Sequence, residues 1–477
     1  MLDHSNVPST PLVVDLDGTL VYTDLLHESV LQLLKVKPWL IFKLPLWLLR
    51  GKTRLKSELA KIAAPPISAL PYNLDLIEFI RQQRALGRRI ILCTASHRYL
   101  AQLVADHLGI FDEVLASDEN INLAGLVKAD ALYERYGHKG FDYAGNSHTD
   151  LAVWNIARRA IAVNVSPLLH KKITKFFELE KSFPRQDASL KDYLKILRVH
   201  QWVKNILIFM PVLAAHTILT DAIWKSLGLA YLSFGLCASF VYVLNDLLDL
   251  ESDRLHSRKR LRPFAAGKIP VWIGALLSPI LILSSFLLAI EVGSQFLFWL
   301  LTYLLLTSLY SWWLKRIVIV DVLTLAILYT IRIVAGAAAV QMPLSFWILA
   351  FSIFLFLSLA FIKRDAELQS YDDVSKKIHG RGYVISDVQL VQQLGVSAGY
   401  SAVMVLALYI NSENIIKLYK MPELIWAGVP LLLWWLSWMW FQANRGLMHD
   451  DPIVFAIKDK TSLLIGILFF GVFALAK

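Results

Sequence analysis

Long apolar runs dominate the second part of the chain and constrain its fold more than any other feature. A helix needs about 20 residues to cross a bilayer, and nine stretches of this chain approach or reach that length. They lie near residues 201–217, 222–244, 271–290, 294–313, 317–340, 344–362, 393–411, 423–441 and 462–476. We therefore predict an all-α polytopic membrane domain of nine transmembrane helices over residues 191–477.

The composition agrees with a membrane protein and excludes several other classes. Of the 477 residues, 56% are hydrophobic and 18% are charged, whereas soluble proteins average about 45–50% and about 25%. The two cysteines, Cys93 and Cys237, are far apart in sequence, which excludes a disulfide framework and a cysteine-based zinc site. No nucleic-acid-binding motif accompanies the net charge of +10. We expect a lipid bilayer, and no nucleic acid, as a partner.

Basic residues are unevenly distributed among the connections between the predicted spans. They concentrate after spans 2, 4, 6 and 8, which the positive-inside rule assigns to the cytoplasm. The N-terminal part has no signal-peptide pattern, so we expect it to stay in the cytoplasm as well. The sequence thus predicts a multi-pass protein of the bacterial cytoplasmic (inner) membrane with its active sites on the cytoplasmic side. The residues interpreted only as topology determinants are Lys315, Arg316, Lys376 and Lys377.

Acidic residues follow the second predicted span at helical spacing. Asn245, Asp249 and Asp253 are four residues apart, with Asp246 beside them, which predicts one polar helix face. Carboxylates at the mouth of a membrane bundle need neutralising cations, and oxygen ligands without His or Cys suit Mg²⁺ together with substrate phosphates. We expect Asp246, Asp249 and Asp253 to bind Mg²⁺ and Asp246 and Asp249 to be essential for catalysis. The alternative is a solvated helix end.

A cationic run, residues 258–268, comes directly after these carboxylates. It contains Lys259, Arg260 and Arg262, which suit the phosphates of a metal-bound diphosphate. Together the two runs resemble the first aspartate-rich motif of the UbiA superfamily of intramembrane prenyltransferases, NDxxDxxxD followed by KxxRPxxxG. The resemblance covers about residues 190–477. It implies nine transmembrane helices, a donor diphosphate bound through Mg²⁺, and a lateral opening for the lipid.

Three further segments resemble one branch of that superfamily, the decaprenyl-phosphate phosphoribosyltransferases. They are the QWVKN sequence at 201–205, the IRIVAG sequence at 331–336 and the KRxxEL sequence at 363–368 with RGY at 381–383. The branch uses phosphoribosyl pyrophosphate as donor and a polyprenyl phosphate as acceptor. The resemblance implies phosphate- or substrate-binding roles for Lys204, Asn245, Lys259, Arg260, Arg262, Arg332, Lys363, Arg364, Glu367, Arg381 and Tyr383.

Some of these positions have a structural alternative. Arg332 lies within an apolar run, where a charge is costly and usually functional, but it could instead form a structural pair. Tyr310 and Asp321 flank a cytoplasmic turn and either line the site or cap helix ends.

The soluble part, residues 1–190, begins with a short buried-strand pattern at Leu12–Val14. Asp15 and Asp17 follow it, and carboxylates two residues apart at a strand end point to the same side. The DxDGT sequence resembles motif I of the haloacid dehalogenase (HAD) superfamily. Thr94 after a second strand, Lys128, and the run 145–150 resemble motifs II, III and IV. The resemblance implies a Rossmann-like α/β domain with a helical cap at about residues 23–72.

The same resemblance implies a phosphatase mechanism. Asp15 attacks phosphorus to form an aspartyl-phosphate, and Asp17 protonates the leaving alcohol and later activates water. Thr94 and Lys128 bind the phosphoryl oxygens. Asp15, Asp17, Asn146 and Asp150 hold Mg²⁺. Motif IV normally offers an acid where this chain has Asn146, so metal binding should be weaker, and an inactive or structural HAD domain is the alternative.

The predicted cap contains an unusually apolar segment, residues 36–52. It is interrupted by proline and lysine, which argues against a membrane span, whereas tryptophans flanked by lysine and arginine suit a membrane interface. The alternative is that these side chains form the core of the cap.

Fusion of the two domains suggests consecutive reactions on one lipid. Phosphoribosyl transfer to a polyprenyl phosphate leaves a 5-phosphate on the sugar, and a phosphatase would remove it. The alternative is a UbiA-type enzyme that moves a prenyl group from a prenyl diphosphate to an aromatic acceptor, with a regulatory or inactive HAD domain. A non-enzymatic membrane scaffold or transporter with degenerate sites is a further alternative. The sequence leaves the polyprenyl length and the oligomeric state open.

Overall fold

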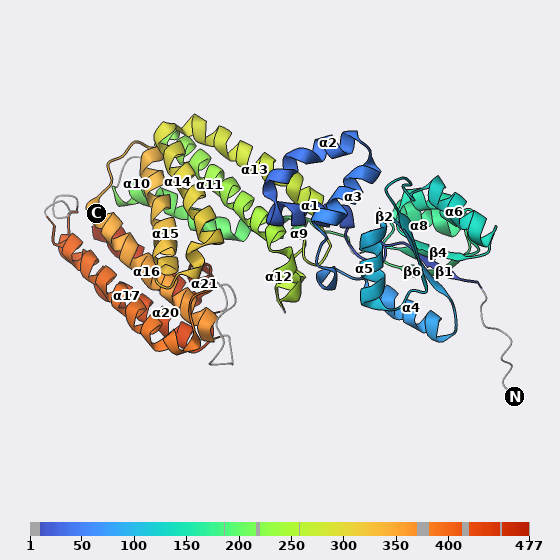
Figure 1. Ribbon diagram of the computed structural model, residues 1–477. Coiled ribbons are helices and arrows are strands. Elements are labelled where there is room, and N and C mark those ends of the chain that lie inside the picture. The colour runs from blue at the N-terminus through green and yellow to red at the C-terminus, as the bar shows by residue number, and fades with distance from the viewer. Residues whose placement is uncertain are drawn as a thin grey trace. The chain divides into compact units, whose positions relative to one another are not determined.

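Six short strands form the centre of the N-terminal part of the chain. In the computed structural model they make one parallel sheet of order β3-β2-β1-β4-β5-β6 (Figure 1). This is the Rossmann-like α/β domain that the sequence predicts. The strands are β1 (Leu12–Val14), β2 (Ile90–His97), β3 (Glu113–Ser117), β4 (Asp142–Gly145), β5 (Ala160–Val163) and β6 (Leu179–Phe183).

The structure describes residues 10–185, 187–215, 220–256, 258–369, 381–412, 419–448 and 451–476. Two compact units make up the chain. The first unit contains Met1–Leu197 and Val243–Ser278, and the second contains Arg198–Tyr242 and Pro279–Lys477. The first unit therefore combines the soluble part with the loop that follows the second predicted span.

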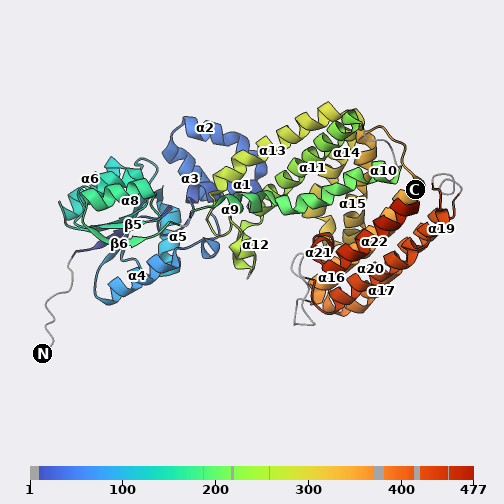
Figure 2. The ribbon, with the colours of Figure 1, turned by 180° about the vertical axis from the view of Figure 1, so that it is seen from behind.

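Alternate side chains of the central strands enter two separate cores. Val14 and Leu92 pack on one side of the sheet, and Val13 and Ile91 pack on the other, as expected for strands that are buried on both faces. Figure 2 shows α4 and α5 on one side of the strands and α6 and α8 on the other. The covering helices are α4 (Leu74–Ala85), α5 (Arg98–Leu108), α6 (Leu126–Tyr136), α7 (Leu151–Trp154) and α8 (Pro167–Phe176).

A helical insertion lies between β1 and α4, where the cap is predicted. Asp24 starts it by accepting a hydrogen bond from the backbone of Leu26, and Gly51, with φ of +112°, makes the turn before the last long helix. A small apolar core of its own includes Leu33 and Trp47. The helices are α1 (Leu25–Val36), η1 (Pro38–Lys43), α2 (Leu44–Leu49), α3 (Lys52–Ile62) and η2 (Ile67–Ala69).

The cap is joined to segment 243–278 inside the first unit. This segment holds the end of α11 (Asp221–Leu248), α12 (Leu250–Leu255), η5 (Lys259–Leu261) and the start of α13 (Val271–Val292). An Arg254 guanidinium nitrogen lies 2.7 Å from a carboxylate oxygen of Glu28 on α1, and both side chains are buried. A buried ion pair of this kind fixes α1 against α12, since breaking it would leave a charge without its partner.

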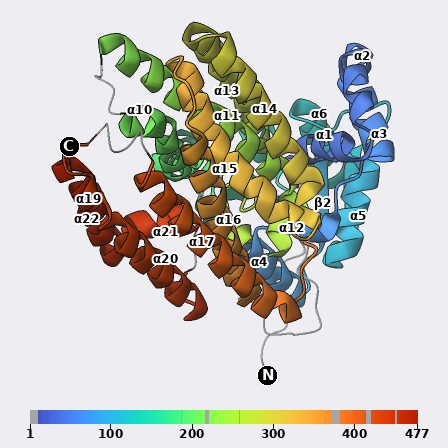
Figure 3. The same cartoon turned by 90° about the vertical axis from the view of Figure 1, so that its left-hand side faces the viewer.

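Helices make up the second unit, in which α15 packs between α14 and α16 (Figure 3). The helices that follow α13 are α14 (Ser294–Trp312), η6 (Leu314–Arg316), α15 (Val320–Ala339), α16 (Phe346–Gln369), η7 (Ile385–Asp387), α17 (Val388–Ile410), α19 (Pro422–Ile425), α20 (Gly428–Asn444), α21 (Pro452–Lys458) and α22 (Lys460–Ala476). The first part of the chain ends with α9 (Leu190–Leu197), which belongs to the first unit, and η4 (Val199–Phe209) and α10 (Met210–Ala214) of the second unit follow it before α11.

Six helices are long and apolar enough to cross a membrane, and a seventh span results if α21 and α22, which are bent by 85°, are counted as one. Within the described ranges, the predicted spans near 201–217 and 294–313 are not among them. The first of these forms η4 and α10 instead of one long helix. The six helices are Asp221–Leu248, Val271–Val292, Val320–Ala339, Phe346–Gln369, Ile385–Ile410 and Pro422–Asn444.

Candidate active sites

The HAD motifs meet where the strand order of the sheet reverses. Asp15 follows β1, Thr94 lies in β2, and Asn146 follows β4. Strand β1 pairs with both β2 and β4, so the carboxyl ends of these three strands lie together at one edge. Ligands of open parallel sheets bind at such a reversal point. The predicted phosphatase residues are therefore gathered at the position where this fold binds ligands.

Asp15 and Lys128 form a buried ion pair with a nitrogen–oxygen distance of 2.7 Å. The Lys128 ammonium also donates to the Tyr143 hydroxyl at 3.0 Å. Burial raises the pKa of Asp15 to about 6, although the charge of Lys128 opposes this rise. Lys128 therefore holds the predicted nucleophile in one orientation and supplies positive charge beside it.

The carboxylate of Asp17 accepts three hydrogen bonds. The Ser96 hydroxyl donates at 2.7 Å, the Thr94 hydroxyl at 3.4 Å and the backbone of Leu25 at 2.9 Å. Burial, together with the neighbouring charge of Asp24, raises the pKa of Asp17 to about 7. A carboxyl group whose pKa lies near neutrality is suited to give and take protons.

Motif IV is organised by Asp150. One of its oxygens accepts from the backbone of Asn146 at 3.1 Å and of Ser147 at 2.9 Å, and the other accepts from the Tyr143 hydroxyl at 2.8 Å. Asp150 thus holds the loop that presents Asn146. The Asn146 side chain lies against Gly18, where a Cβ atom would come within 2.0 Å of its amide nitrogen.

The oxygen donors of this site fit Mg²⁺ in chemical type. Asp15, Asp17 and Asn146 offer carboxylate and amide oxygens, the ligands that Mg²⁺ prefers. Among the described residues, however, no group of three or more His, Cys, Asp or Glu side chains is arranged as metal ligands.

A cavity of about 440 Å³ opens beside the HAD motifs within the first unit. It is lined by motif residues, including Asp17 and Asn146, by His27 of the cap, and by Pro270, Val271 and Trp272. Helix α13, which is long and apolar enough to cross a membrane, begins at Val271. One wall of the cavity therefore belongs to the end of a candidate membrane span.

The acidic motif at the end of α11 is arranged differently from the single helix face that its spacing predicts. Helix α11 ends at Leu248, and Asp249 is exposed at the break before α12. The carboxylates of Asp246 and Asp253 are buried and accept from the same Arg262 nitrogen, at 3.0 and 2.6 Å. Two carboxylates suffice for Mg²⁺ when substrate phosphates supply further oxygens. Asn245 is half-buried, whereas Lys259 and Arg260 are exposed.

In the second unit, two predicted cations, Lys204 and Lys363, pair with one buried carboxylate. Lys204 lies 2.7 Å and Lys363 lies 3.3 Å from the same oxygen of Asp451, and the Tyr329 hydroxyl donates to both oxygens. The Arg332 guanidinium is 5.6 Å from the centre of the Tyr329 ring. We call Lys204, Tyr329, Arg332, Lys363 and Asp451 the lysine cluster.

Arg332 is also held by neutral partners of η4 and α14. It donates to the Asn205 side chain at 3.1 Å and to the Tyr303 hydroxyl at 3.2 Å. The amide nitrogen of Asn205 is buried and has no hydrogen-bond partner among the residues that the structure describes. Asn205 belongs to the QWVKN sequence, which lies in the 3₁₀ helix η4. Short 3₁₀ segments often mark functional sites.

The remaining predicted residues gather around Asp321. Arg364 is fully buried with a nitrogen 2.7 Å from Asp321, and it also pairs with Glu367. Arg381 lies 3.7 Å from carboxylate oxygens of both acids, and the Tyr383 hydroxyl donates to Asp321 at 2.8 Å. Adjacent residues 363 and 364 thus belong to different clusters. Carboxylates, rather than open space, surround Arg364, which favours a positioning role for it.

Sequence reasoning missed Asp451, Tyr329, Ser96 and Tyr143 as parts of these sites, and it left open whether Asp321 lines a site. Asp451 caps α21 and resembles an ordinary helix-capping residue in the sequence. A buried tyrosine hydroxyl needs a hydrogen-bond partner, and this signal could have pointed to Tyr143 and Tyr329. Lys376 and Lys377 lie outside the described residues.

Two family models match the chain. The model for haloacid dehalogenase-like hydrolases matches residues 12–153, and the model for the UbiA prenyltransferase family matches residues 207–457, more than half of the chain. The chain belongs to the UbiA prenyltransferase family. This UbiA member carries a HAD-like domain at its N-terminal side, which confirms the predicted fusion. Family membership and the apolar helices together indicate a multi-pass membrane protein.

Three relatives extend this comparison of the UbiA member. Uncharacterized protein y4nM of Sinorhizobium fredii is 36% identical over 98% of this chain and 91% of its own length. Nodulation protein NoeC of Azorhizobium caulinodans is 37% identical over 57% of this chain and 89% of its own. Decaprenyl-phosphate phosphoribosyltransferase of Mycolicibacterium smegmatis is 27% identical over 58% of this chain and 90% of its own.

Proposed function

We propose that the chain transfers a 5-phosphoribosyl group from phosphoribosyl pyrophosphate to a polyprenyl phosphate, and that its HAD-like domain removes the 5-phosphate of the product. The similarity to a protein named decaprenyl-phosphate phosphoribosyltransferase supports the donor and the acceptor. The coupling of the two steps rests on the cavity lined by Asp17, Asn146 and the start of α13. A phosphate ester bound there could keep its lipid tail beside a membrane-spanning helix.

In the transfer step, a phosphate oxygen of the lipid attacks the anomeric carbon of the ribose. The bond from that carbon to the diphosphate breaks, and the diphosphate leaves with the electron pair. Lys204, Lys363 and Arg332 bind phosphate oxygens of the two substrates in this proposal, because cations in a low dielectric stabilise such charge strongly. Bound by Asp246, Asp249 and Asp253, Mg²⁺ would neutralise the departing diphosphate.

In the hydrolytic step, a carboxylate oxygen of Asp15 attacks phosphorus, and the bond to the ribose 5-oxygen breaks. Asp17 gives its proton to that oxygen and then takes a proton from the water that hydrolyses the aspartyl-phosphate. Thr94 and Lys128 bind phosphoryl oxygens. Mg²⁺ on Asp15, Asp17 and Asn146 would neutralise phosphate charge, with Asp150 holding the loop.

We further propose that nine helices cross the cytoplasmic membrane and that both sites face the cytoplasm. The concentration of basic residues in alternate loops supports this orientation. Because phosphoribosyl pyrophosphate is a soluble cytoplasmic metabolite and the acceptor is a lipid, both active sites need access to the cytoplasmic surface of the membrane.

A second function starts from Asn146, whose uncharged side chain favours a HAD-like domain that does not hydrolyse phosphate, and from the match of the other domain to the UbiA prenyltransferase family. In that account the HAD-like domain is regulatory, and the UbiA domain moves a prenyl group from a prenyl diphosphate to an aromatic acceptor.

Donor choice distinguishes the two accounts. The full chain in lipid nanodiscs is incubated with Mg²⁺ and either ribose-labelled phosphoribosyl pyrophosphate with decaprenyl phosphate, or a prenyl diphosphate with 4-hydroxybenzoate. We expect labelled lipid only from the first pair, resolved by mass spectrometry into forms with and without the 5-phosphate. Prenylated benzoate without labelled lipid would overturn the proposal. The control variant Glu251→Gln changes an acid beside the motif but outside the proposed ligand set, and it should behave as the wild type.

A further inference from the structure

The cap carries exposed apolar side chains at the end of α1 and along η1 and α2. Phe42 is 84% exposed, Leu49 85% and Trp39 65%. Val36, Leu46 and Leu48 are exposed beside them. We call these six residues the cap apolar face. Water-exposed apolar groups gathered in one short segment mark a surface that another apolar phase covers.

The cap apolar face is separate from the core of the cap. Trp47, from the same segment, is buried against Leu33, Leu59 and Ala63. The two interpretations of this segment from the sequence therefore apply to different side chains. Trp47 stabilises the cap, whereas Trp39, Phe42 and Leu49 make little contact with it. Their exposure calls for a role other than folding of the cap.

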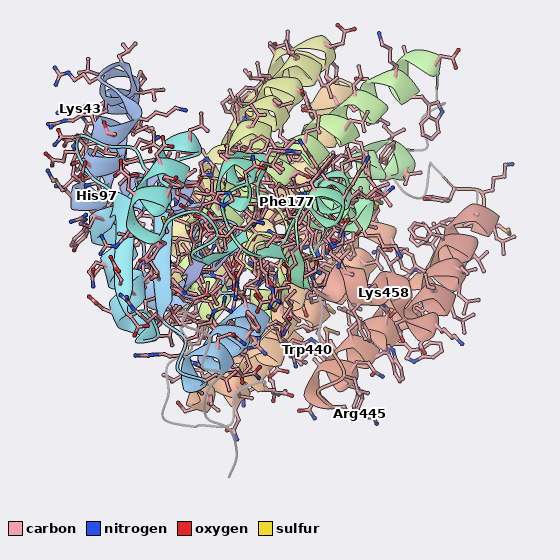
Figure 4. The ribbon with its side chains drawn as sticks, turned by 90° about the vertical axis from the view of Figure 1, so that its right-hand side faces the viewer. Lys43, His97, Phe177, Trp440, Arg445 and Lys458 are labelled. Atoms are coloured by element: carbon pink, nitrogen blue, oxygen red, sulfur yellow. The ribbon has the colours of Figure 1, made fainter. Side chains whose placement is uncertain are left out.

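Positive charge surrounds the cap apolar face. No acidic residue occurs between Glu28 and Glu58, while seven lysines and arginines lie in that stretch. Those exposed to solvent include Lys37, Lys43 and Arg50, and Lys43 stands at the outer edge of the cap (Figure 4). Apolar side chains with a cationic rim fit the boundary between headgroups and acyl chains of a membrane that contains anionic lipid.

The chain that carries this cap also has six candidate membrane spans, so the cap is tethered to a bilayer by its own chain. Within the first unit, Glu28 at the base of the cap is paired with Arg254, six residues after the end of α11, itself a candidate span. A second copy of the chain fits the face less well, because two cationic rims would repel each other.

We propose that the cap apolar face is a membrane-binding surface, which inserts Trp39, Phe42 and Leu49 into the cytoplasmic leaflet and contacts anionic headgroups through Lys37, Lys43 and Arg50. This surface would keep the HAD-like domain at the membrane whatever its substrate is. The inference therefore goes beyond the proposed function and does not depend on turnover.

Site-specific labelling of the full chain tests this surface. Both native cysteines, Cys93 and Cys237, are buried, so a maleimide nitrobenzoxadiazole probe can be directed to Phe42→Cys. The matched control is Leu126→Cys, which replaces another exposed apolar residue on α6. The labelled proteins are placed in nanodiscs of phosphatidylcholine with about 30% of the anionic lipid phosphatidylglycerol and in nanodiscs of phosphatidylcholine alone.

We expect doxyl-labelled lipid to quench the probe at position 42 at least about 3-fold more than at position 126, and quenching to decrease without phosphatidylglycerol. Equal quenching at the two positions would overturn the proposal. A blue-shifted emission at position 42 without lipid quenching would also overturn it, because a protein surface would then cover the face. Neither readout requires enzymatic activity. This test can therefore fail while the proposed function stands, and the proposed function can fail while this test succeeds.

Discussion

The carboxylate of Asp451 lies 2.7 Å from the ammonium group of Lys204, although 247 residues separate them in the sequence. Both side chains are at least 90% buried. Lys363 and the Tyr329 hydroxyl complete the surroundings of this carboxylate. One acid near the C-terminal end thus holds two lysines that sequence resemblance assigns to substrate binding.

Replacing Asp451 by alanine is expected to destabilise the protein as well as to impair transfer. Removing one partner of a buried ion pair typically costs about 3–5 kcal/mol, because the other charge stays buried. Thermal unfolding in detergent should show a lower Tm for Asp451→Ala. The triple variant Lys204→Met/Lys363→Met/Asp451→Leu, which removes the acid together with both of its lysine partners, should recover most of the Tm but none of the transfer. An unchanged Tm in Asp451→Ala would contradict the buried pair.

The proposed metal site at the end of α11 predicts different behaviour for two acids of one motif. Asp246→Ala should lose transfer and also stability, because it leaves Arg262 with one carboxylate fewer. Asp249→Ala should lower the transfer rate by about 100-fold or more, if one metal ligand contributes roughly 3 kcal/mol to the transition state. The Tm of this variant should stay unchanged, because Asp249 is exposed. Normal turnover in either variant would remove that residue from the ligand set.

Gly18 allows a prediction that separates the two activities. Its φ is +73°, and an added Cβ would lie 2.0 Å from the Asn146 amide nitrogen. Gly18→Ala should therefore displace Asn146 and abolish phosphatase activity while transfer continues. Gly109→Ala is the control, because Gly109 has a similar φ of +62° with nothing within 4 Å. If the two variants hydrolyse equally well, contact with Asn146 is unimportant.

Asn146→Asp restores the acid that motif IV usually has. We expect the variant to remain active and to need a lower Mg²⁺ concentration for half-maximal phosphatase activity, because a carboxylate attracts the cation more strongly than an amide does. The phosphatase rate is measured as a function of Mg²⁺ concentration for both the wild type and the variant. The transfer rate of the same samples is the internal control, because the substitution should not change it. Complete loss of hydrolysis would mean that the amide nitrogen of Asn146 has a function of its own.

The parts of the sites that depend on local sequence could be predicted, whereas those that depend on distant partners could not. Asp15 directly follows a strand and Lys128 belongs to a short motif on α6, and the two side chains are in contact. Lys204 and Lys363 were predicted as substrate-binding residues, but their shared partner Asp451 follows only from the folded helices.

Backbone breaks explain other differences from the sequence-based expectations. Helical spacing predicts that Asp249 shares a face with Asp253, but α11 ends at Leu248 and leaves Asp249 exposed. Periodicity also cannot distinguish Trp47, which is buried, from Trp39, which is exposed, since both lie in one irregular apolar segment. The apolar run at 201–217 predicts a span, yet its described residues form a 3₁₀ segment and a short helix.

The coupled reaction is tested most directly by the variant Asp15→Asn. Its amide cannot act as a nucleophile, so hydrolysis should stop at the first step while the transferase site is unchanged. The full chain in nanodiscs is given Mg²⁺, phosphoribosyl pyrophosphate and decaprenyl phosphate, and the lipid products are followed over time by mass spectrometry. Lipid-linked ribose 5-phosphate should accumulate at a rate near that of the wild type, without the dephosphorylated lipid. Equal amounts of dephosphorylated product from Asp15→Asn and the wild type would contradict the account.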